Sequence, residues 1–503
     1  MKILVMMLAA VTLPRPAAAQ PPSDSVAARL GRSHVMRAFA VLGGDSVLHR
    51  IATLDVRGVG TEWRSAEVQG PSPDRETPSP HEEWLVADVR GGRVVHEYRT
   101  GRHDGSTRWR RFIYDAETRT FGDFIVRAAG RGHSPSAAES RRQLSRRLPH
   151  LLLGEVIGNT ASVRALADTL ITGRMHHVVS YTPADRRTPL HLFIDGSSGF
   201  LEKVAHDVEF PGIGQTRLTL EFVRYAPHTQ LRFAPTGHVL RLAGARVQEV
   251  RYTHLKVNEA SSDTAFQLPE DLRPFVSEPG TVRRVAPGVF VVESLEGFNM
   301  MFVEFRDFVL AVEAPASHPT IAGLPVENPR GSAGIARAFI DKIEHTVPGK
   351  PIRYVAVTHF HSDHAGGVPA FLAREATVLT TPKNRAFFER LTQTTNGVET
   401  IAGKRVVTDG EQIVELIDVG PNPHTDEMLV VHLPRHGILF QGDLFYFSGE
   451  STFPDRGRLG IMRHFAQWLE RNRLEPRRIY GVHGTGYATM EHVRRVRLTT
   501  PVR

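Results

Sequence analysis

The sequence of 503 residues contains no cysteine. This absence excludes disulfide bonds, a thiolate nucleophile and cysteine metal ligands. Any metal site must therefore use histidine, aspartate or glutamate side chains. After the first residues the sequence also lacks a run of eighteen apolar residues, so we expect no transmembrane helix. The hydrophobic fraction of 41% and the charged fraction of 23% are typical of a globular protein with an apolar core.

Dense blocks of basic charge are also absent. The formal net charge of +8 at pH 7 comes mainly from arginines that are scattered along the chain. No sequence pattern of an RNA- or DNA-binding module accompanies them. We therefore expect a basic, solvated surface and no nucleic acid partner. The sequence leaves the oligomeric state open.

Residues 1–19 have the pattern of a secretory signal peptide. Lys2 precedes a short apolar segment that ends near Leu13, and Ala17 to Ala19 form a cleavage pattern of the A-x-A kind. We expect cleavage after Ala19 and hence a periplasmic or secreted location.

The rest of the chain divides into two regions, as its length suggests. Residues 20–268 begin with a helix predicted over 23–42 and continue as short alternating segments between glycine-rich turns, which predicts an antiparallel β domain. One helix, predicted over 140–153, interrupts the strands. Residues 269–280 are predicted to be a linker. In residues 281–503 apolar strands alternate with helices, which predicts a layered α/β domain.

The first region resembles the lipoprotein-carrier half-barrels of the bacterial envelope. The resemblance rests on one N-terminal helix followed by a run of antiparallel strands, and on the turn sequence "FIDGSSGFLEKV". It implies a curved sheet for residues 20–268. The alternative is a generic β domain that packs on the second region.

The stretch "THFHSDHAGG" carries three histidines and one aspartate within six positions, directly after a predicted buried strand. His359 and His361 are two residues apart, so their rings can converge on one ion. Asp363 and His364 could reach a second position beside the first. Neutral imidazoles and carboxylates suit zinc and related divalent ions. Because this pattern is rare by chance, it is specific for a metal site.

One loop cannot complete two metal sites, and three later strand boundaries each supply one more candidate ligand. "GPNPHTDE" supplies His424, "GILFQGDLF" supplies Asp443 and "IYGVHGTG" supplies His483. The other histidines of this region lack such spacing and are expected at the surface or in packing: His345, His432, His436, His464 and His492. In the β region, His176 and His177 are predicted to be a polar strand start.

Along the chain, H-x-H-x-D-H is followed by a single His, then by Gly-Asp and then by His-Gly. In this order the motifs over residues 281–503 resemble those of the metallo-β-lactamase superfamily. The resemblance implies an αββα sandwich with the metals at one edge, and so a mixed α+β and α/β fold class. The implied ligands are His359, His361 and His424 for one metal and Asp363, His364 and His483 for a second, with Asp443 bridging both.

Some positions differ from the usual family pattern or lie beside the ligands. Glu313 ends an early strand where the family usually has aspartate. It is expected to support the metal ligands without binding the metal itself. Asp443 after a glycine is more typical of the glyoxalase-II and lactonase type, because antibiotic-hydrolysing branches often carry cysteine or serine near that point. Phe360, Tyr446 and Tyr487 flank ligand positions and are candidates either for a substrate pocket or for core packing.

The resemblance implies an enzyme, namely an exported dinuclear metal-dependent hydrolase. Two zinc ions per chain are expected, although iron or manganese would also fit. A hydroxide that bridges the metals would attack a carbonyl substrate, either an ester, a thioester, a lactone or a lactam. Asp363 would be the catalytic residue that orients the hydroxide and passes a proton to the leaving group. A small molecule is therefore the expected partner.

Three alternatives stay open. The same ligands could support phosphodiesterase or nuclease chemistry. Redox di-iron chemistry is less favoured, because such relatives usually carry glutamate where this sequence has His361. A non-catalytic envelope protein could bind an apolar ligand in the β region and use the second region as a sensor or scaffold.

Overall fold

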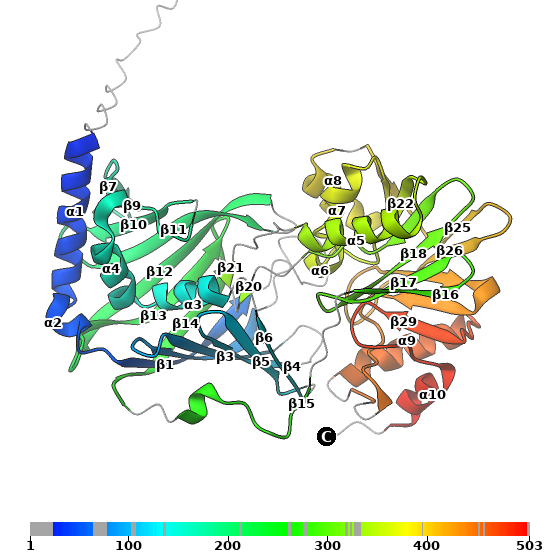
Figure 1. Ribbon diagram of the computed structural model, residues 1–503, viewed down its shortest axis with the longest axis horizontal. Coiled ribbons are helices and arrows are strands. Elements are labelled where there is room, and N and C mark those ends of the chain that lie inside the picture. The colour runs from blue at the N-terminus through cyan, green and yellow to red at the C-terminus, as the bar shows by residue number, and fades with distance from the viewer. Residues whose placement is uncertain are drawn as a thin grey trace, which may run out of the picture.

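The computed structural model describes residues 24–63, 78–101, 107–125, 127–133, 137–186, 188–210, 214–259, 263–274, 280–316, 320–321, 324–325, 333–394, 396–450, 453–455 and 458–499. These residues form a β domain up to residue 274 and an α/β domain from residue 280 (Figure 1). The predicted signal peptide, residues 1–19, lies outside the described residues.

The β domain is built on one sheet of 15 strands, in the order β15-β6-β5-β4-β3-β2-β1-β14-β13-β12-β11-β10-β9-β7, with β8 paired to β9. The strands are β1 Thr53–Trp63, β2 Pro78–Asp88, β3 Arg93–Gly101, β4 Thr107–Tyr114, β5 Thr118–Asp123, β6 Ala128–His133, β7 Arg164–Ala165, β8 Thr169–Ile171, β9 Arg174–Tyr181, β10 Leu190–Asp195, β11 Leu201–Phe210, β12 Gly214–His228, β13 Arg232–Leu242, β14 Ala245–Val257 and β15 Arg273–Pro274. All pairs are antiparallel except β15 with β6. The predicted meander is therefore present.

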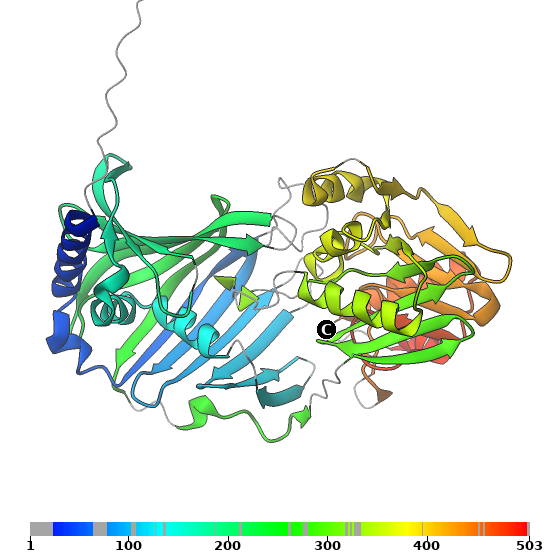
Figure 2. The ribbon, with the colours of Figure 1, turned by 45° about the horizontal axis from the view of Figure 1, so that its top comes forward.

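Four helices belong to this domain, and α1, α3 and α4 pack on one face of the curved sheet (Figure 2). They are α1 Asp24–Val41, α2 Gly44–Leu48, α3 Ala137–Arg146 and α4 Pro149–Gly158. The helix predicted over 23–42 corresponds to α1. The single helix predicted over 140–153 is wrong, because two helices occupy this region. Pro149 disfavours helical geometry at Leu148, which is extended with φ −104° and ψ 110°, and begins the second helix itself.

The predicted linker, residues 269–280, is partly built into the β domain. Residues 273–274 form β15 and pair with β6 at the end of the sheet. Just before it, Phe266 and Leu268 pack on a small cluster formed by Val86, Val95 and Ile113. The chain therefore covers part of the second face of the sheet before it enters the α/β domain.

The α/β domain contains two stacked sheets. The first has the order β16-β17-β18-β19-β22-β23-β24 and the second the order β25-β26-β27-β28-β29. The strands of the first sheet are β16 Thr281–Ala286, β17 Val289–Leu295, β18 Phe298–Glu304, β19 Val309–Val312, β22 Ile352–Ala356, β23 Thr377–Thr380 and β24 Val398–Thr400. Those of the second are β25 Lys404–Thr408, β26 Ile413–Asp418, β27 Leu429–Leu433, β28 Ile438–Gln441 and β29 Arg478–Gly481. A short hairpin, β20 Thr320–Ile321 with β21 Leu324–Pro325, lies outside both sheets.

Helices cover both outer faces of this pair of sheets (Figure 1). The helices α5 Gly334–Thr346, α7 Val368–Leu372 and α8 Arg385–Thr392 contribute to the core of the first sheet, and the short α6 Ser362–Ala365 precedes α7. The helices α9 Leu459–Arg471 and α10 Met490–Leu498 pack on the second sheet. This αββα arrangement, preceded by a mainly antiparallel β domain, confirms the predicted fold class.

The loops of both sheets meet at one edge for two reasons, namely the direction of the parallel strands and a hydrogen bond between the sheets. Strands β19, β22, β23 and β24 are parallel, so their carboxyl ends point the same way, and β28 is parallel to β29 in the other sheet. The start of β27 is hydrogen-bonded to the loop after β22, from Leu429 N to Thr358 O at 2.8 Å. Within the described residues, no helix is long and apolar enough to span a membrane.

Helix α1 packs closely on β7 at Gly31, and a substitution there tests this contact. A Cβ atom at this position would meet Ala165 N at 2.7 Å and Arg164 C at 2.8 Å, both backbone atoms that cannot move aside easily. Although alanine favours a helix by about 1 kcal/mol over glycine, the overlap costs about 1–3 kcal/mol. We expect Gly31→Ala to lower the free energy of unfolding by about 1 kcal/mol in urea titrations. Gly460→Ala in α9, where a Cβ meets no atom within 4 Å, should not lower it.

We expect buried His150 to make the β domain sensitive to acid. Burial lowers the pKa of this histidine to about 4, although its ring contacts the backbone carbonyl of Leu231 at 3.3 Å. Since the folded pKa lies below the unfolded value of about 6.5, its contribution to stability is present above pH 6.5 and is lost as the pH falls towards 4. We expect His150→Gln to reduce the loss of unfolding free energy between pH 7 and 4.5 by about 2–3 kcal/mol, measured by urea unfolding. Identical pH profiles for the two proteins would contradict this.

Candidate metal centre

The loop between β22 and α7 is held tightly against the first sheet. Ala314 N donates to His364 O at 2.9 Å, and Gly367 N donates to Ala314 O at 2.8 Å. A side chain at Gly367 would overlap Ala336 Cβ at 2.4 Å and Pro315 O at 2.7 Å, so only glycine fits between this loop and α5. These contacts fix the backbone that carries the predicted ligands.

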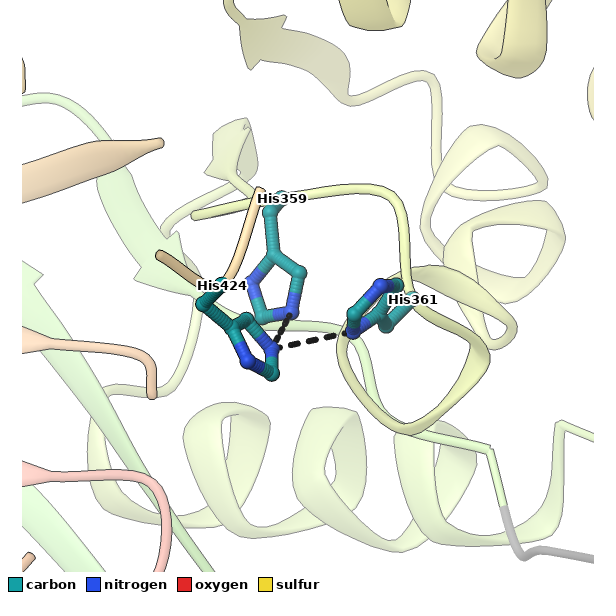
Figure 3. Close-up of side chains that lie close together, drawn as sticks. All are labelled: His359, His361 and His424. Carbon is teal, nitrogen blue, oxygen red and sulfur yellow. Dashed lines mark hydrogen bonds between the residues drawn. The ribbon is translucent and has the colours of Figure 1, made fainter. Parts of the chain in front are cut away.

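His359, His361 and His424 form a compact, buried cluster (Figure 3). The Nε2 atom of His424 lies 3.2 Å from Nε2 of His359 and 3.1 Å from Nδ1 of His361. All three side chains are at most 1% exposed. The structure thus brings together the first predicted ligand set from two loops.

This cluster fits a metal ion. Two nitrogens that bind one tetrahedral zinc ion at about 2.0–2.1 Å lie roughly 3.3 Å apart, which is close to the separations seen here. Burial, together with the neighbouring His364, His361 and His424, holds the pKa of His359 well below its usual value. A neutral imidazole is the form that binds a metal.

The second predicted set lies directly beside the first. Asp363, His364 and His483 place ligand atoms within 4.8 Å of one another, and Asp443 lies between the two sets. Asp443 Oδ1 is 3.0 Å from His364 Nε2 and 3.4 Å from His483 Nε2. Asp443 Oδ2 is 3.5 Å from His424 Nε2, so its two oxygens face different sets. This is the geometry expected of a bridging carboxylate.

Electrostatics tie Asp443 and His364 together. Burial raises the pKa of Asp443, but His483, His364 and His424 outweigh it and hold the pKa well below its usual range. Burial lowers the pKa of His364, but the carboxylates of Glu313, Asp443 and Asp363 outweigh it and raise the pKa well above its usual value. The carboxylates therefore stabilise positive charge at this position, whether it comes from a proton or from a metal ion.

Glu313 lies beside the ring of His364. Its Oε2 atom is 3.4 Å from Nδ1 of His364, and both side chains are fully buried. Glu313 follows β19 with a φ of 77°, a left-handed conformation that costs a residue other than glycine about 1–3 kcal/mol. This strain is consistent with a requirement for a carboxylate at that point.

Sequence reasoning missed several residues that position the ligands. Thr358 Oγ1 is 3.1 Å from His359 Nδ1, and Asn422 Oδ1 accepts hydrogen bonds from the backbone N–H groups of His424 and Thr425. Asn299, on β18, donates to the backbone oxygens of Gly481 and Gly484, on either side of His483. A lone asparagine in the apolar strand "FNMMFVE" was the available signal for Asn299.

The three candidate aromatic residues have different surroundings. Tyr446 is buried, and its hydroxyl donates to Asp443 Oδ2 at 2.7 Å. Phe360 is 2% exposed and packs on His361 and Phe387, which places it in the interior. Tyr487 is 45% exposed with its ring against Tyr480.

The remaining histidines of the α/β domain have other surroundings. His432 contacts Glu415, His436 contacts Gln412 and His492 contacts Glu450. None of His345, His432, His436, His464 and His492 belongs to a group that could hold a metal among the described residues.

A further group in the β domain, His176 with Asp195 and Glu202, also brings ligand atoms together. His176 is part of β9 and not a strand start. Arg174 already donates to Asp195 at 2.9 Å and to both oxygens of Glu202. The Arg174 guanidinium group thus occupies the position that a metal ion would take. His176, Asp195 and Glu202 form an ion-pair network with Arg174.

Comparison with known proteins finds one family and a set of solved structures. Residues 331–483 match the model of the family described as the metallo-beta-lactamase superfamily. Among solved structures, the metallo-beta-lactamase FIM-1 from Pseudomonas aeruginosa in its mono-zinc form shares 22% identity, covering 44% of this chain and 94% of its own, with a TM-score of 0.32. A metallo-beta-lactamase from Pontibacter korlensis shares 17% identity over 44% of this chain and 100% of its own, with a TM-score of 0.33. Curated protein sequences give no match.

The family match confirms the predicted superfamily for this part of the chain. It supports an enzyme, and in coarse terms a metal-dependent hydrolase. The match ends at His483, so all seven predicted ligands lie inside it. Glu313 lies outside the matched residues.

Glu313→Gln tests whether the buried carboxylate supports the metal centre. The amide keeps the shape of the side chain but removes the negative charge beside His364. Changes in such supporting groups typically weaken metal binding about 10–100-fold. We expect that loss of zinc affinity in competition with a chromogenic chelator. Glu304→Gln, at a partly exposed carboxylate paired with Lys350, is the matched control and should bind zinc normally. Equal affinities for both variants would show that Glu313 plays no part.

Proposed function

From the match of residues 331–483 to the metallo-beta-lactamase superfamily, we propose that this chain is an exported dinuclear zinc hydrolase. Its substrates would be carbonyl compounds, namely esters, thioesters, lactones or lactams. The observation that carries the proposal is the position of Asp443, whose two oxygens face two adjoining ligand sets. The first nineteen residues, with their secretory pattern, support export.

The two ligand sets differ in exposure, which indicates where a substrate approaches. The first set is fully enclosed, whereas the side chains of His483 and Asp363 are 26% and 13% exposed. A fully enclosed set leaves no room for an organic substrate. The substrate carbonyl therefore approaches beside Asp363 and His483.

Bound zinc ions would polarise the substrate carbonyl and lower the pKa of a water molecule to about 7. Asp363 is placed to handle the proton. Its Oδ2 atom lies 3.4 Å from His483 Nε2 and 3.9 Å from His364 Nε2, at the exposed side of the cluster. It can accept a proton from the attacking water and deliver it to the leaving group.

Tyr446 keeps Asp443 in place during this reaction. Its hydroxyl donates to Asp443 Oδ2, and the guanidinium carbon of Arg458 lies 3.6 Å from the centre of its ring. The cation over the ring face stabilises the position of the tyrosine. Because Tyr446 is buried, its role here is to orient the carboxylate rather than to contact the substrate.

Metal content and a panel of substrates test the proposal. We expect the purified protein to contain close to two zinc ions per chain, measured by mass spectrometry of the metal. Nitrocefin, an acyl-homoserine lactone, a thioester and bis-nitrophenyl phosphate would separate the hydrolase classes. Less than one metal ion per chain, or hydrolysis of the phosphodiester alone, would contradict a dinuclear carbonyl hydrolase.

Asp363→Asn separates catalysis from folding. The amide cannot accept the proton, so we expect kcat to fall about 10²–10⁴-fold on whichever substrate is active, with zinc in excess. Asp341→Asn, at an exposed aspartate of α5, is the matched control and should leave kcat unchanged. If the Asp363 variant keeps full activity, the chemistry lies elsewhere.

A further inference from the structure

The outer side of α1 leaves three large apolar side chains about half exposed within the described part of the chain. Val26, Leu30 and Met36 are 39%, 44% and 51% exposed. On the opposite side of the same helix, Val35 and Phe39 are buried in the core of the β domain. The outer side of a surface helix normally carries polar and charged side chains, so three large apolar ones there are unusual.

A neighbouring hairpin exposes two more apolar side chains. Leu170 of β8 lies directly opposite Met175 of β9, and the two residues are 67% and 47% exposed. His177, two residues after Met175 on the same face of β9, stacks on His34 of α1 with ring centroids 3.9 Å apart. The hairpin thus lies beside the helix, as Figure 1 also shows. We call Val26, Leu30, Met36, Leu170 and Met175 the apolar face.

Arginines lie among these apolar residues. Arg29 is exposed and Arg32 is partly exposed, and neither forms an ion pair within the described part of the chain. Arg37 donates to the backbone oxygen of Ser197 at 2.8 Å and forms no ion pair with a carboxylate of the described residues. The one acidic residue in the sequence of α1 is Asp24, at its first position. On α1 the apolar face therefore lies beside positive charge that the helix itself does not balance, while Asp168 near the hairpin contacts His177 at 3.0 Å.

We propose that the apolar face and its arginines bind the surface of an anionic phospholipid membrane. Apolar side chains can enter the region between lipid headgroups, while arginines bind lipid phosphates through bidentate hydrogen bonds. Each arginine near an anionic surface adds to the electrostatic attraction. A second copy of the chain fits less well, because it would bring two sets of unbalanced arginines together.

The position of α1 in the molecule is compatible with binding to a membrane surface. The helix lies at the end of the molecule that is opposite the α/β domain (Figures 1 and 2). A protein that binds through α1 would therefore hold its metal centre away from the lipid surface. The proposal concerns location only and does not depend on which substrate is hydrolysed.

Vesicle flotation tests the proposal with the chain from Gln20 to Arg503, which keeps every described residue and removes the apolar N-terminal segment. We expect flotation with vesicles of phosphatidylcholine containing about 30% phosphatidylglycerol, and a loss of flotation with pure phosphatidylcholine. Raised salt should weaken the binding. Absence of binding to the anionic vesicles would overturn the proposal.

Two double variants identify the surface. Leu30→Asp with Met175→Asp removes apolar contacts, and Arg29→Glu with Arg32→Glu reverses charge, so each should weaken vesicle binding roughly tenfold or more. Val406→Asp and Arg284→Glu, at exposed positions of the α/β domain, are matched controls and should bind normally. Thermal unfolding confirms that each variant is folded. Equal binding by all variants would overturn the proposal, as would a dimer, detected by light scattering, that the α1 variants disperse.

Discussion

The buried carboxylate of Asp443 connects the two predicted ligand sets. One oxygen faces His364 at 3.0 Å and the other faces His424 at 3.5 Å. A buried carboxylate is strongly unfavourable unless positive charge and hydrogen bonds surround it. The histidines, the hydroxyl of Tyr446 and the bound cations that we propose supply that compensation. Much of the neighbouring structure serves to hold this group between its partners.

The backbone on both sides of Asp443 is correspondingly constrained. Gln441 accepts hydrogen bonds from the N–H groups of Leu444 and Phe445, which turns the chain sharply after β28. A side chain at Gly442 would lie 2.6 Å from Thr358 Oγ1, the atom beside the His359 ring. The absence of a side chain therefore lets the two loops approach each other. The ligands and their supports form one packed unit, and the strained backbone of Glu313 belongs to it.

The candidate ligands that the structure brings together could be picked out in the sequence because their signal is local. The spacing of His359 to His364 is visible within one loop, and His424, Asp443 and His483 each lie beside a recognisable strand. Supporting residues such as Asn299 act across about 180 positions of sequence, and no local pattern shows which loop they reach. The same limit applies to the β domain. Its alternating strands were evident, but the break between α3 and α4 depended on how Pro149 acts within an otherwise helical stretch.

The ligands come from two different sheets. His359 and His364 follow β22 of the first sheet, whereas Asp443 follows β28 of the second. Each ligand set combines residues beside both sheets, so the distances within each set depend on how closely the two sheets stack through the apolar side chains between them. Metal coordination tolerates distance errors of only about 0.2 Å. If these residues hold the metal ions that we propose, the packing of the apolar core between the sheets contributes to metal affinity although it supplies no ligand.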